Sequence, residues 1–235
     1  MRLPNLILLL LILGFKNNIF SQTDIPEGFQ LVYLQDFESP QAVRDFEMTD
    51  SKAWRISETD IGRSFELFGK SDYKASVRSP FNIAIIKDLI VGDFILEADL
   101  NQTGKEYGHR DLCLFFGVNN PTNFYYTHIA SVADDHANNI FLVNDEPRVK
   151  IATKTTKTND WGTTESWHKV RVERYTASGS IKVYFDNMKI PIMEAVDIHF
   201  LEGMIGIGSF DDTGKFDNIK IWSNKVIDKN VGFFR

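Results

Sequence analysis

The segment Phe94-Ile95-Leu96-Glu97-Ala98-Asp99-Leu100 decides the fold class of this chain. Every second position from Phe94 onward is apolar, and the positions between them carry both carboxylates. A period of two places the apolar side chains on one face of a β-strand. The same alternation recurs in residues 169–173 and 181–185, and the nearly apolar run 112–118 is typical of a strand covered on both faces. The chain is therefore predicted to consist mostly of strands.

Short polar turns separate these runs, for example at Asn119-Asn120-Pro121 and Asp186-Asn187. Helical signals are weak, and only residues 39–48 could form a turn or two, with Ser39 as N-cap and Pro40 at the first position. Many strands joined by short polar turns predict an all-β fold, a two-sheet antiparallel jelly-roll β-sandwich.

The last part of the chain carries a family resemblance. Residues 203–210 (GMIGIGSF) and 216–222 (FDNIKIW) resemble the closing strands of concanavalin A-like (laminin G-like) jelly rolls, and residues 167–172 and 179–186 resemble the preceding pair. Members of that family include lectin-like modules, laminarinase-type hydrolases, alginate lyase-type enzymes and domains of polysaccharide-utilisation systems. The resemblance therefore implies the same sandwich fold and a carbohydrate ligand.

The N-terminal residues are typical of a secretory signal peptide. Arg2 precedes the apolar run 6–13, and the segment ends in the small residue Ser21. We expect residues 1–21 to be removed on export to the periplasm or exterior, and residues 22–235 to form a single jelly-roll domain. Cys113 is the only cysteine, so an intrachain disulfide is excluded.

The charge balance bears on the partner. The chain has 26 basic and 32 acidic residues, which argues against non-specific binding to nucleic acid or to an anionic membrane. A local cluster of basic side chains could still hold an anionic ligand. We therefore expect an anionic oligosaccharide or polysaccharide as partner, with no nucleic acid and no membrane.

Residues 109–139 hold three of the five histidines, together with tyrosines, aspartates and amides that a purely structural strand does not need. Elimination next to a uronate carboxylate requires a cation for the carboxylate, a base and an acid. Arginine suits the first role, and histidine and tyrosine suit the others. We expect Tyr126, His128 and His109 to be catalytic and Arg110 to bind the carboxylate. The alternative is that Tyr126 packs across strands and His128 is a hydrogen-bonded structural residue.

Further side chains are candidates for substrate binding. A polar loop with Asp134 and Asn139 could bind sugar hydroxyls, or its side chains could simply cap backbone groups of a turn. Aromatic rings near it could stack on a sugar. The expected substrate-binding residues, besides Arg110, are Tyr125, Asp135, His136, Asn138 and Trp161.

No cofactor is expected. His109, His128 and His136 could in principle join an aspartate around zinc, but no adjacent-ligand spacing supports such a site. Asp211, Asp212 and Asp217 could hold a structural calcium, and Asx-turn hydrogen bonds explain them as well.

The favoured hypothesis is a carbohydrate-active carbon–oxygen lyase that performs β-elimination, either dehydration or glycosidic cleavage, on uronic-acid-containing oligosaccharides. The chain is similar to small jelly-roll proteins of marine polysaccharide degradation, which include oligosaccharide dehydratases for ulvan-like glycans. Two alternatives stay open, a non-catalytic glycan-binding protein and a glycoside hydrolase. The Glu-x-Asp-x-x-Glu motif of laminarinase-type hydrolases is missing, since Glu97-Ala98-Asp99 is followed by Asn101 and Gln102.

Overall fold

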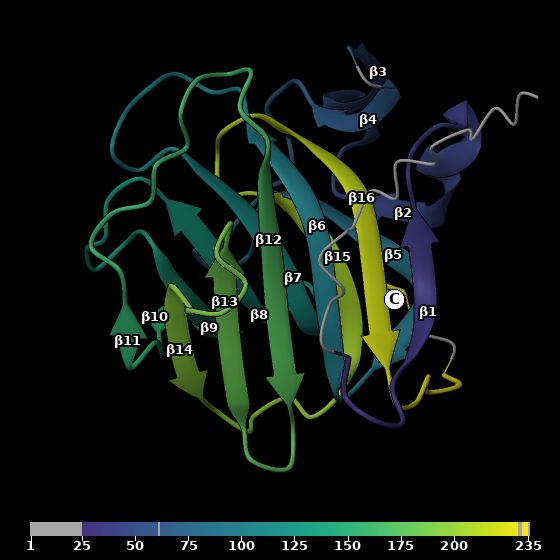
Figure 1. The fold of residues 1–235 in the computed structure, drawn as a ribbon, viewed down its shortest axis with the longest axis vertical. Coiled ribbons are helices and arrows are strands. Elements are labelled where there is room, and N and C mark those ends of the chain that lie inside the picture. The colour runs from purple at the N-terminus through teal and green to yellow at the C-terminus, as the bar shows by residue number, and fades with distance from the viewer. Residues whose placement is uncertain (1–24, 61, 230–231, 235) are drawn as a thin grey trace, which may run out of the picture.

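The computed structural model describes residues 25–60, 62–229 and 232–234, so the expected signal peptide lies outside the described residues. The described chain forms two antiparallel sheets packed face to face, with one sheet in front of the other in Figure 1. The predicted all-β jelly-roll sandwich is therefore confirmed. Among the described residues, no helix is long and apolar enough to cross a membrane.

The front sheet has the strand order β11-β14-β13-β12-β6-β16-β4-β3, and β1 also pairs with β16. The pairing of β1 with β16 brings the first and last strands side by side. The strands of this sheet are β1 (Gln30–Gln35), β3 (Trp54–Thr59), β4 (Gly62–Leu67), β6 (Phe94–Gln102), β11 (Lys154–Thr155), β12 (His168–Tyr175), β13 (Ser180–Phe185), β14 (Met193–Val196) and β16 (Gly214–Ser223).

The back sheet has the order β10-β9-β8-β7-β15-β5-β2. Its strands are β2 (Phe46–Met48), β5 (Asn82–Val91), β7 (Asp111–Asn120), β8 (Asn123–Ala130), β9 (Asn139–Asn144), β10 (Val149–Lys150) and β15 (Gly203–Ser209). Two short 3₁₀ helices complete the elements, η1 (Pro40–Asp45) and η2 (Ser51–Ala53). The Ser39 side chain caps η1 by accepting a hydrogen bond from the backbone N–H of Gln41, as expected.

The core between the sheets contains Phe94, Leu96, Ala98 and Leu100, the apolar face of the segment that predicted the fold. Burial of such side chains contributes roughly 25 cal/mol per Å² of apolar surface, which makes the interleaved faces the main source of stability.

Strand β7 is covered on both faces, as its apolar sequence predicts. Leu112 and Leu114 face the core between the sheets, whereas Cys113 and Phe115 belong to a second apolar cluster. This cluster lies on the outer face of the back sheet and includes Phe233 from the C-terminal segment. A strand that is buried only on its core-facing side would carry polar residues on its outer side, and β7 carries apolar ones. The outer face of the back sheet is therefore the unusual surface of the molecule.

Candidate functional site

Tyr126 and His128 share one face of β8, as predicted, and this is the outer face of the back sheet. Tyr126 lies opposite Phe115, and its ring stacks on that of Phe141 at a centroid distance of 5.2 Å. Tyr126 is completely buried and His128 is 3% exposed. Neither side chain could touch a ligand unless the groups above it moved.

Burial controls how these two groups ionise. Desolvation, helped by the positive charge of Arg148, lowers the pKa of His128 to about 3. Desolvation raises the pKa of Tyr126 well above its usual value. His128 is therefore neutral at neutral pH, and its Nδ1 is buried without a hydrogen-bond partner. One ring nitrogen of the neutral His128 carries no proton and could accept one, but burial makes this imidazole a weak base.

Arg148 is the functional candidate that the sequence did not reveal. Its Nη1 donates to the Tyr126 hydroxyl at 2.6 Å, and its Nη2 donates to the His136 carbonyl at 2.8 Å. The guanidinium carbon lies 4.4 Å from the ring centre of Phe141 and 4.3 Å from that of Phe210. Arg148 is a single basic residue in a polar turn before β10, so no sequence pattern distinguishes it.

Arg110 does not lie beside Tyr126 and His128, which contradicts its expected role as the residue that binds the carboxylate next to them. Its guanidinium donates to the Gly162 carbonyl at 2.9 Å and to the Ser131 hydroxyl at 3.4 Å, and the residue is 5% exposed. Successive residues of a strand alternate between faces, so Arg110 faces away from the side that carries Tyr126 and His128. The Arg110 side chain thus connects the loop that contains Gly162 with the loop that contains Ser131.

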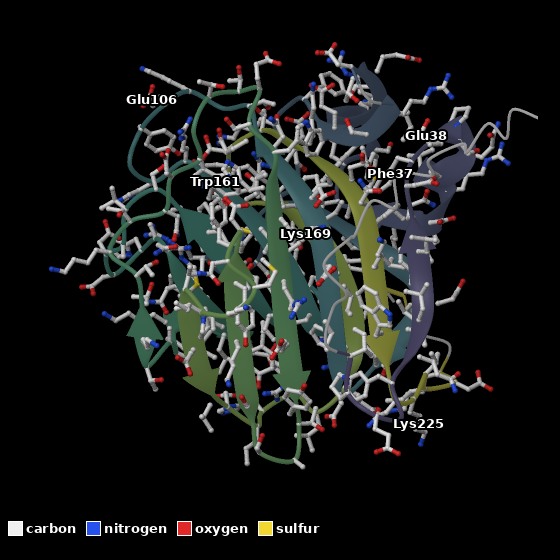
Figure 2. The ribbon with its side chains drawn as sticks, viewed as in Figure 1. Phe37, Glu38, Glu106, Trp161, Lys169 and Lys225 are labelled. Carbon is white, nitrogen blue, oxygen red and sulfur yellow. The ribbon has the colours of Figure 1, made fainter. Side chains whose placement is uncertain are left out.

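Three other expected binding residues are structural, and their complete burial contradicts the predicted contact with substrate. Tyr125 donates a short hydrogen bond to Asp197 and accepts one from a backbone N–H. Trp161 packs edge-on against Phe185 at one end of the sandwich, as Figure 2 shows for its position. Asn138, which has a φ of 48°, donates to the Thr156 carbonyl at 2.9 Å.

The remaining candidates are exposed. His109 Nε2 lies 2.5 Å from Asp134 Oδ2. Asp135 forms an ion pair with Lys150. Asp134 accepts hydrogen bonds from the backbone N–H groups of His136 and Ala137, as the polar-turn alternative requires. Roles for His109, Asp135 and His136 stay predictions.

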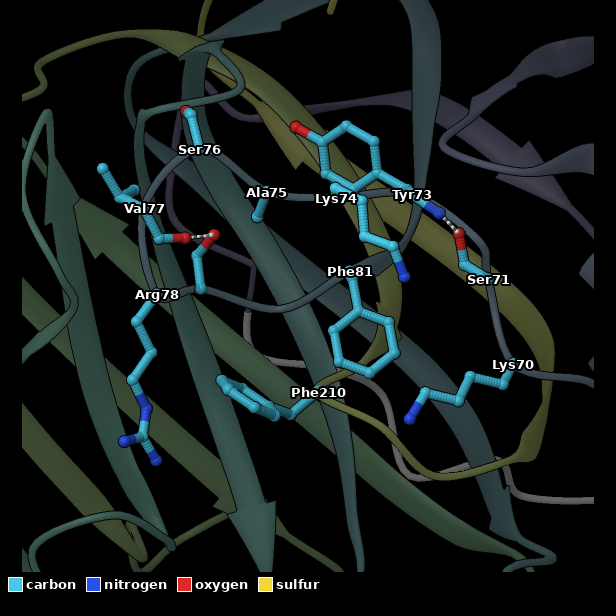
Figure 3. Close-up of a pocket in the computed structure, with 11 residues that line it drawn as sticks. Lys70, Ser71, Tyr73, Lys74, Ala75, Ser76, Val77, Arg78, Phe81 and Phe210 are labelled. Carbon is cyan, nitrogen blue, oxygen red and sulfur yellow. Dashed lines mark hydrogen bonds between the residues drawn. The ribbon is translucent and has the colours of Figure 1, made fainter.

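A basic cavity opens beside this cluster. The segment between β4 and β5 folds over the outer face of the back sheet and encloses a volume of about 480 Å³. Figure 3 shows the amines of Lys70 and Lys74 extending toward the ring of Phe81, with Phe210 beyond that ring and Arg78 at the other side. No aspartate or glutamate is among the lining residues that the structure describes. The local sign of charge is thus opposite to that of the whole chain.

The cavity lies next to the buried pair, Tyr126 and His128. Phe210 lines the cavity and also lies against the Arg148 guanidinium and, at 6.1 Å between ring centres, against His128. The backbone N–H of Arg148 donates to the Arg78 carbonyl at 3.0 Å. Three basic residues within nine positions, Lys70, Lys74 and Arg78, were the sequence signal that could have indicated this site.

The expected metal ligands are distributed differently from the prediction. Asp217 is on β16 of the front sheet, where burial and the charges of Asp99 and Glu38 raise its pKa to about 7. Asp211 and Asp212 instead lie with Asp111. In the described part of the chain, this aspartate group, and not the three histidines, gathers within the range of a metal ion.

Comparison with solved structures finds other proteins with a similar fold. A carbohydrate-binding module, CBM66, from Bacillus subtilis superposes with a TM-score of 0.53 and 19% identity, over 76% of this chain and 96% of the module. A Bacillus subtilis protein with a galectin-like fold gives a TM-score of 0.55 and 12% identity, over 85% and 97% of the two chains.

An enzyme is also similar. A xylan β-1,4-xylosidase from Bacillus halodurans C-125 gives a TM-score of 0.53 and 11% identity, over 85% of this chain but only 41% of the enzyme. No protein-family model matches the chain, and no curated protein sequence does so either. At these identities the likeness shows the fold alone, a two-sheet antiparallel β-sandwich.

Proposed function

We propose that this protein is a carbohydrate-active protein that binds uronic-acid-containing oligosaccharides in the basic cavity. One observation carries the proposal. Lys70, Lys74 and Arg78 line a cavity in which no described residue is acidic, although acidic residues outnumber basic ones in the chain. We also propose that the protein is exported, which suits a polymeric glycan as the source of its ligand.

The chemistry of the cavity suits an acidic sugar. Lysine and arginine offer positive charge and hydrogen-bond donors to a carboxylate, and arginine can bind it through two parallel hydrogen bonds. The rings of Phe81 and Phe210 offer apolar faces to the C–H side of a pyranose. The volume of about 480 Å³ lies within the usual range of small-molecule sites, roughly 300–1,000 Å³. The similar carbohydrate-binding module supports a glycan as ligand.

Binding calorimetry with matched oligosaccharides tests the proposal. A uronate oligosaccharide should bind the full chain more tightly than a neutral oligosaccharide of equal length, and added salt should weaken the difference. Lys74→Gln and Arg78→Gln should each weaken uronate binding. Lys225→Gln is the matched control, because it removes the same charge at an exposed position near the other end of the molecule (Figure 2). Equal affinities for the charged and neutral ligands would contradict the proposal.

A second, finer proposal is that the bound uronate undergoes β-elimination. The observation that favours it is the contact between Arg148 Nη1 and the Tyr126 hydroxyl, beside a neutral His128. Arg148 takes the role of carboxylate ligand that the sequence assigned to Arg110. A base removes the proton at C5, the C4–O bond breaks, and the departing oxygen receives a proton.

Substrate would have to displace Arg148 from Tyr126 for this reaction, because both acid–base candidates are covered. Both forms of the elimination create a C4=C5 double bond conjugated with the carboxyl group. A rise in ultraviolet absorbance on mixing with uronate oligosaccharides therefore tests the finer proposal. Binding without such a rise would leave a glycan-binding protein, and cleavage that leaves a saturated sugar at the new non-reducing end would indicate a hydrolase.

A further inference from the structure

Three carboxylates gather at one end of the back sheet. Asp111 opens β7, and Asp211 and Asp212 lie in the turn between β15 and β16. One oxygen of each lies within 4.8 Å of the others. Asp212 Oδ2 is held there by the Tyr107 hydroxyl and by the backbone N–H of Asp111, each at 2.9 Å.

Nothing in the described protein balances this negative charge. None of the three carboxylates forms an ion pair with a lysine or arginine that the structure describes. Among the described residues, the basic side chain that comes within 4 Å of these carboxylates is that of His128, whose Nε2 is 3.8 Å from Asp111 Oδ2.

Buried polar atoms without partners face the same place. Asp111 Oδ1 is buried without a hydrogen bond, and so are both amide atoms of the completely buried Gln102. A Cβ on Gly104 would lie 2.8 Å from Gln102 Nε2 and 2.9 Å from Asp212 Oδ1. The amide and the carboxylate thus flank one small space that a glycine keeps open. Buried polar groups without partners are rare, because each leaves the cost of its desolvation uncompensated.

We propose that Asp111, Asp211, Asp212 and the Gln102 side-chain carbonyl form a binding site for a divalent cation, and that the cation is calcium. Carboxylate and amide oxygens are the ligands that calcium prefers, and its flexible coordination accepts such an irregular set completed by water. A rotation of the Gln102 amide by half a turn presents its oxygen. The cation would satisfy the unpaired oxygens and neutralise the carboxylates.

A cation here would also act on the sugar cavity. The turn that carries Asp211 and Asp212 begins directly after Phe210, whose ring lines the cavity and packs against Arg148. Phe210 N also donates to Asp111 Oδ2 at 2.8 Å. Binding of calcium would therefore fix this turn against β7 and hold Phe210 in position. The inference stands independently of the nature of the sugar.

Thermal unfolding of the full chain tests the site. Protein treated with a chelator and then titrated with calcium chloride should show a rise in Tm of about 5–10 °C at a hundredfold excess over Kd. Titration calorimetry should give one strong site. Asp211→Asn changes an exposed residue and should abolish the rise without harming the fold. Asp228→Asn, an exposed aspartate outside the group, should keep the full rise.

Asp111→Asn gives the sharper result. It removes a buried charge, so the chelated variant should be as stable as the chelated native protein or more stable, while its response to calcium is lost. Should this variant fail to fold, Asp211→Asn and the calorimetry still decide the matter. A native protein whose Tm does not respond to millimolar calcium would overturn the proposal. A rise that survives either substitution would do so too, because the cation would then bind elsewhere.

Discussion

Tyr126→Phe is the substitution that probes the buried pair most cleanly, because it removes one hydroxyl group and keeps the stacked ring. In the native protein this hydroxyl accepts a hydrogen bond of 2.6 Å from Arg148, which is a charged donor. Hydrogen bonds to charged groups contribute about 1.5–3 kcal/mol to stability. Arg148 is half-buried and can turn toward water, so the lower end of this range applies.

The free energy of unfolding should therefore fall by about 1.5 kcal/mol. For a domain of this size 1 kcal/mol shifts Tm by about 2–4 °C, so the expected decrease is about 3–6 °C. Urea unfolding and a thermal scan measure these quantities. If the proposed elimination occurs, the turnover rate should also fall by about 10²–10⁴-fold, while uronate binding is kept.

Tyr125→Phe is the matched control. Tyr125 is also completely buried and its hydroxyl has two partners, Asp197 and the backbone N–H of Phe200, but its ring faces the core between the sheets. This variant should lose stability and keep its turnover. If Tyr126→Phe leaves the free energy of unfolding unchanged, Arg148 does not bind Tyr126 as described. Equal losses of turnover in both variants would remove Tyr126 from the chemistry.

Two further predictions concern residues outside the cavity. Arg110→Met should lower the free energy of unfolding by about 1.5 kcal/mol, since the partly buried hydrogen bond to the Gly162 carbonyl is lost. Calorimetry should find uronate binding unchanged, and weakened binding would return Arg110 to the site. Asp217 has a pKa raised to about 7 in the folded state, so the folded protein binds its proton more tightly than the unfolded chain. Its contribution to stability is full below the unfolded pKa near 3.8 and is lost as the pH rises to about 7. Asp217→Asn should therefore flatten the decline between these pH values in urea titrations, and an unchanged decline would contradict the assigned cause.

The fold was predictable because its signal is local. The alternation in residues 94–100 depends only on which neighbours along the strand face the core, and the structure buries that face. The nearly apolar run 112–118 likewise predicted a strand that is covered on both sides, and β7 contacts an apolar cluster on each face.

The site was predictable only in part, since it depends on register and on contacts between distant segments. Tyr126 and His128 do share a face, because that follows from their spacing along β8. Their relation to Arg110 depends on how β7 pairs with β8. Cys113 lies opposite His128, so the odd-numbered positions of β7 share the face of His128 and Arg110 faces the other way.

The predictions for the loop residues Trp161 and Asn138 were wrong for a related reason. Trp161 and Asn138 lie in polar stretches that suggest exposure, yet other loops cover them completely. The cavity joins a segment near residue 74 with Phe210, which is far away in sequence. The close spacing of Lys70, Lys74 and Arg78 marks a basic segment in the sequence, but no short-range pattern connects it with Phe210 or Arg148.

A crystal structure of the protein with a bound uronate oligosaccharide tests the central claim most directly. The account predicts the sugar in the cavity beside Phe81 and Phe210, with its carboxylate within hydrogen-bond distance of Lys74, Arg78 or Arg148. An oligosaccharide bound on another surface, with this cavity free of sugar, would contradict it.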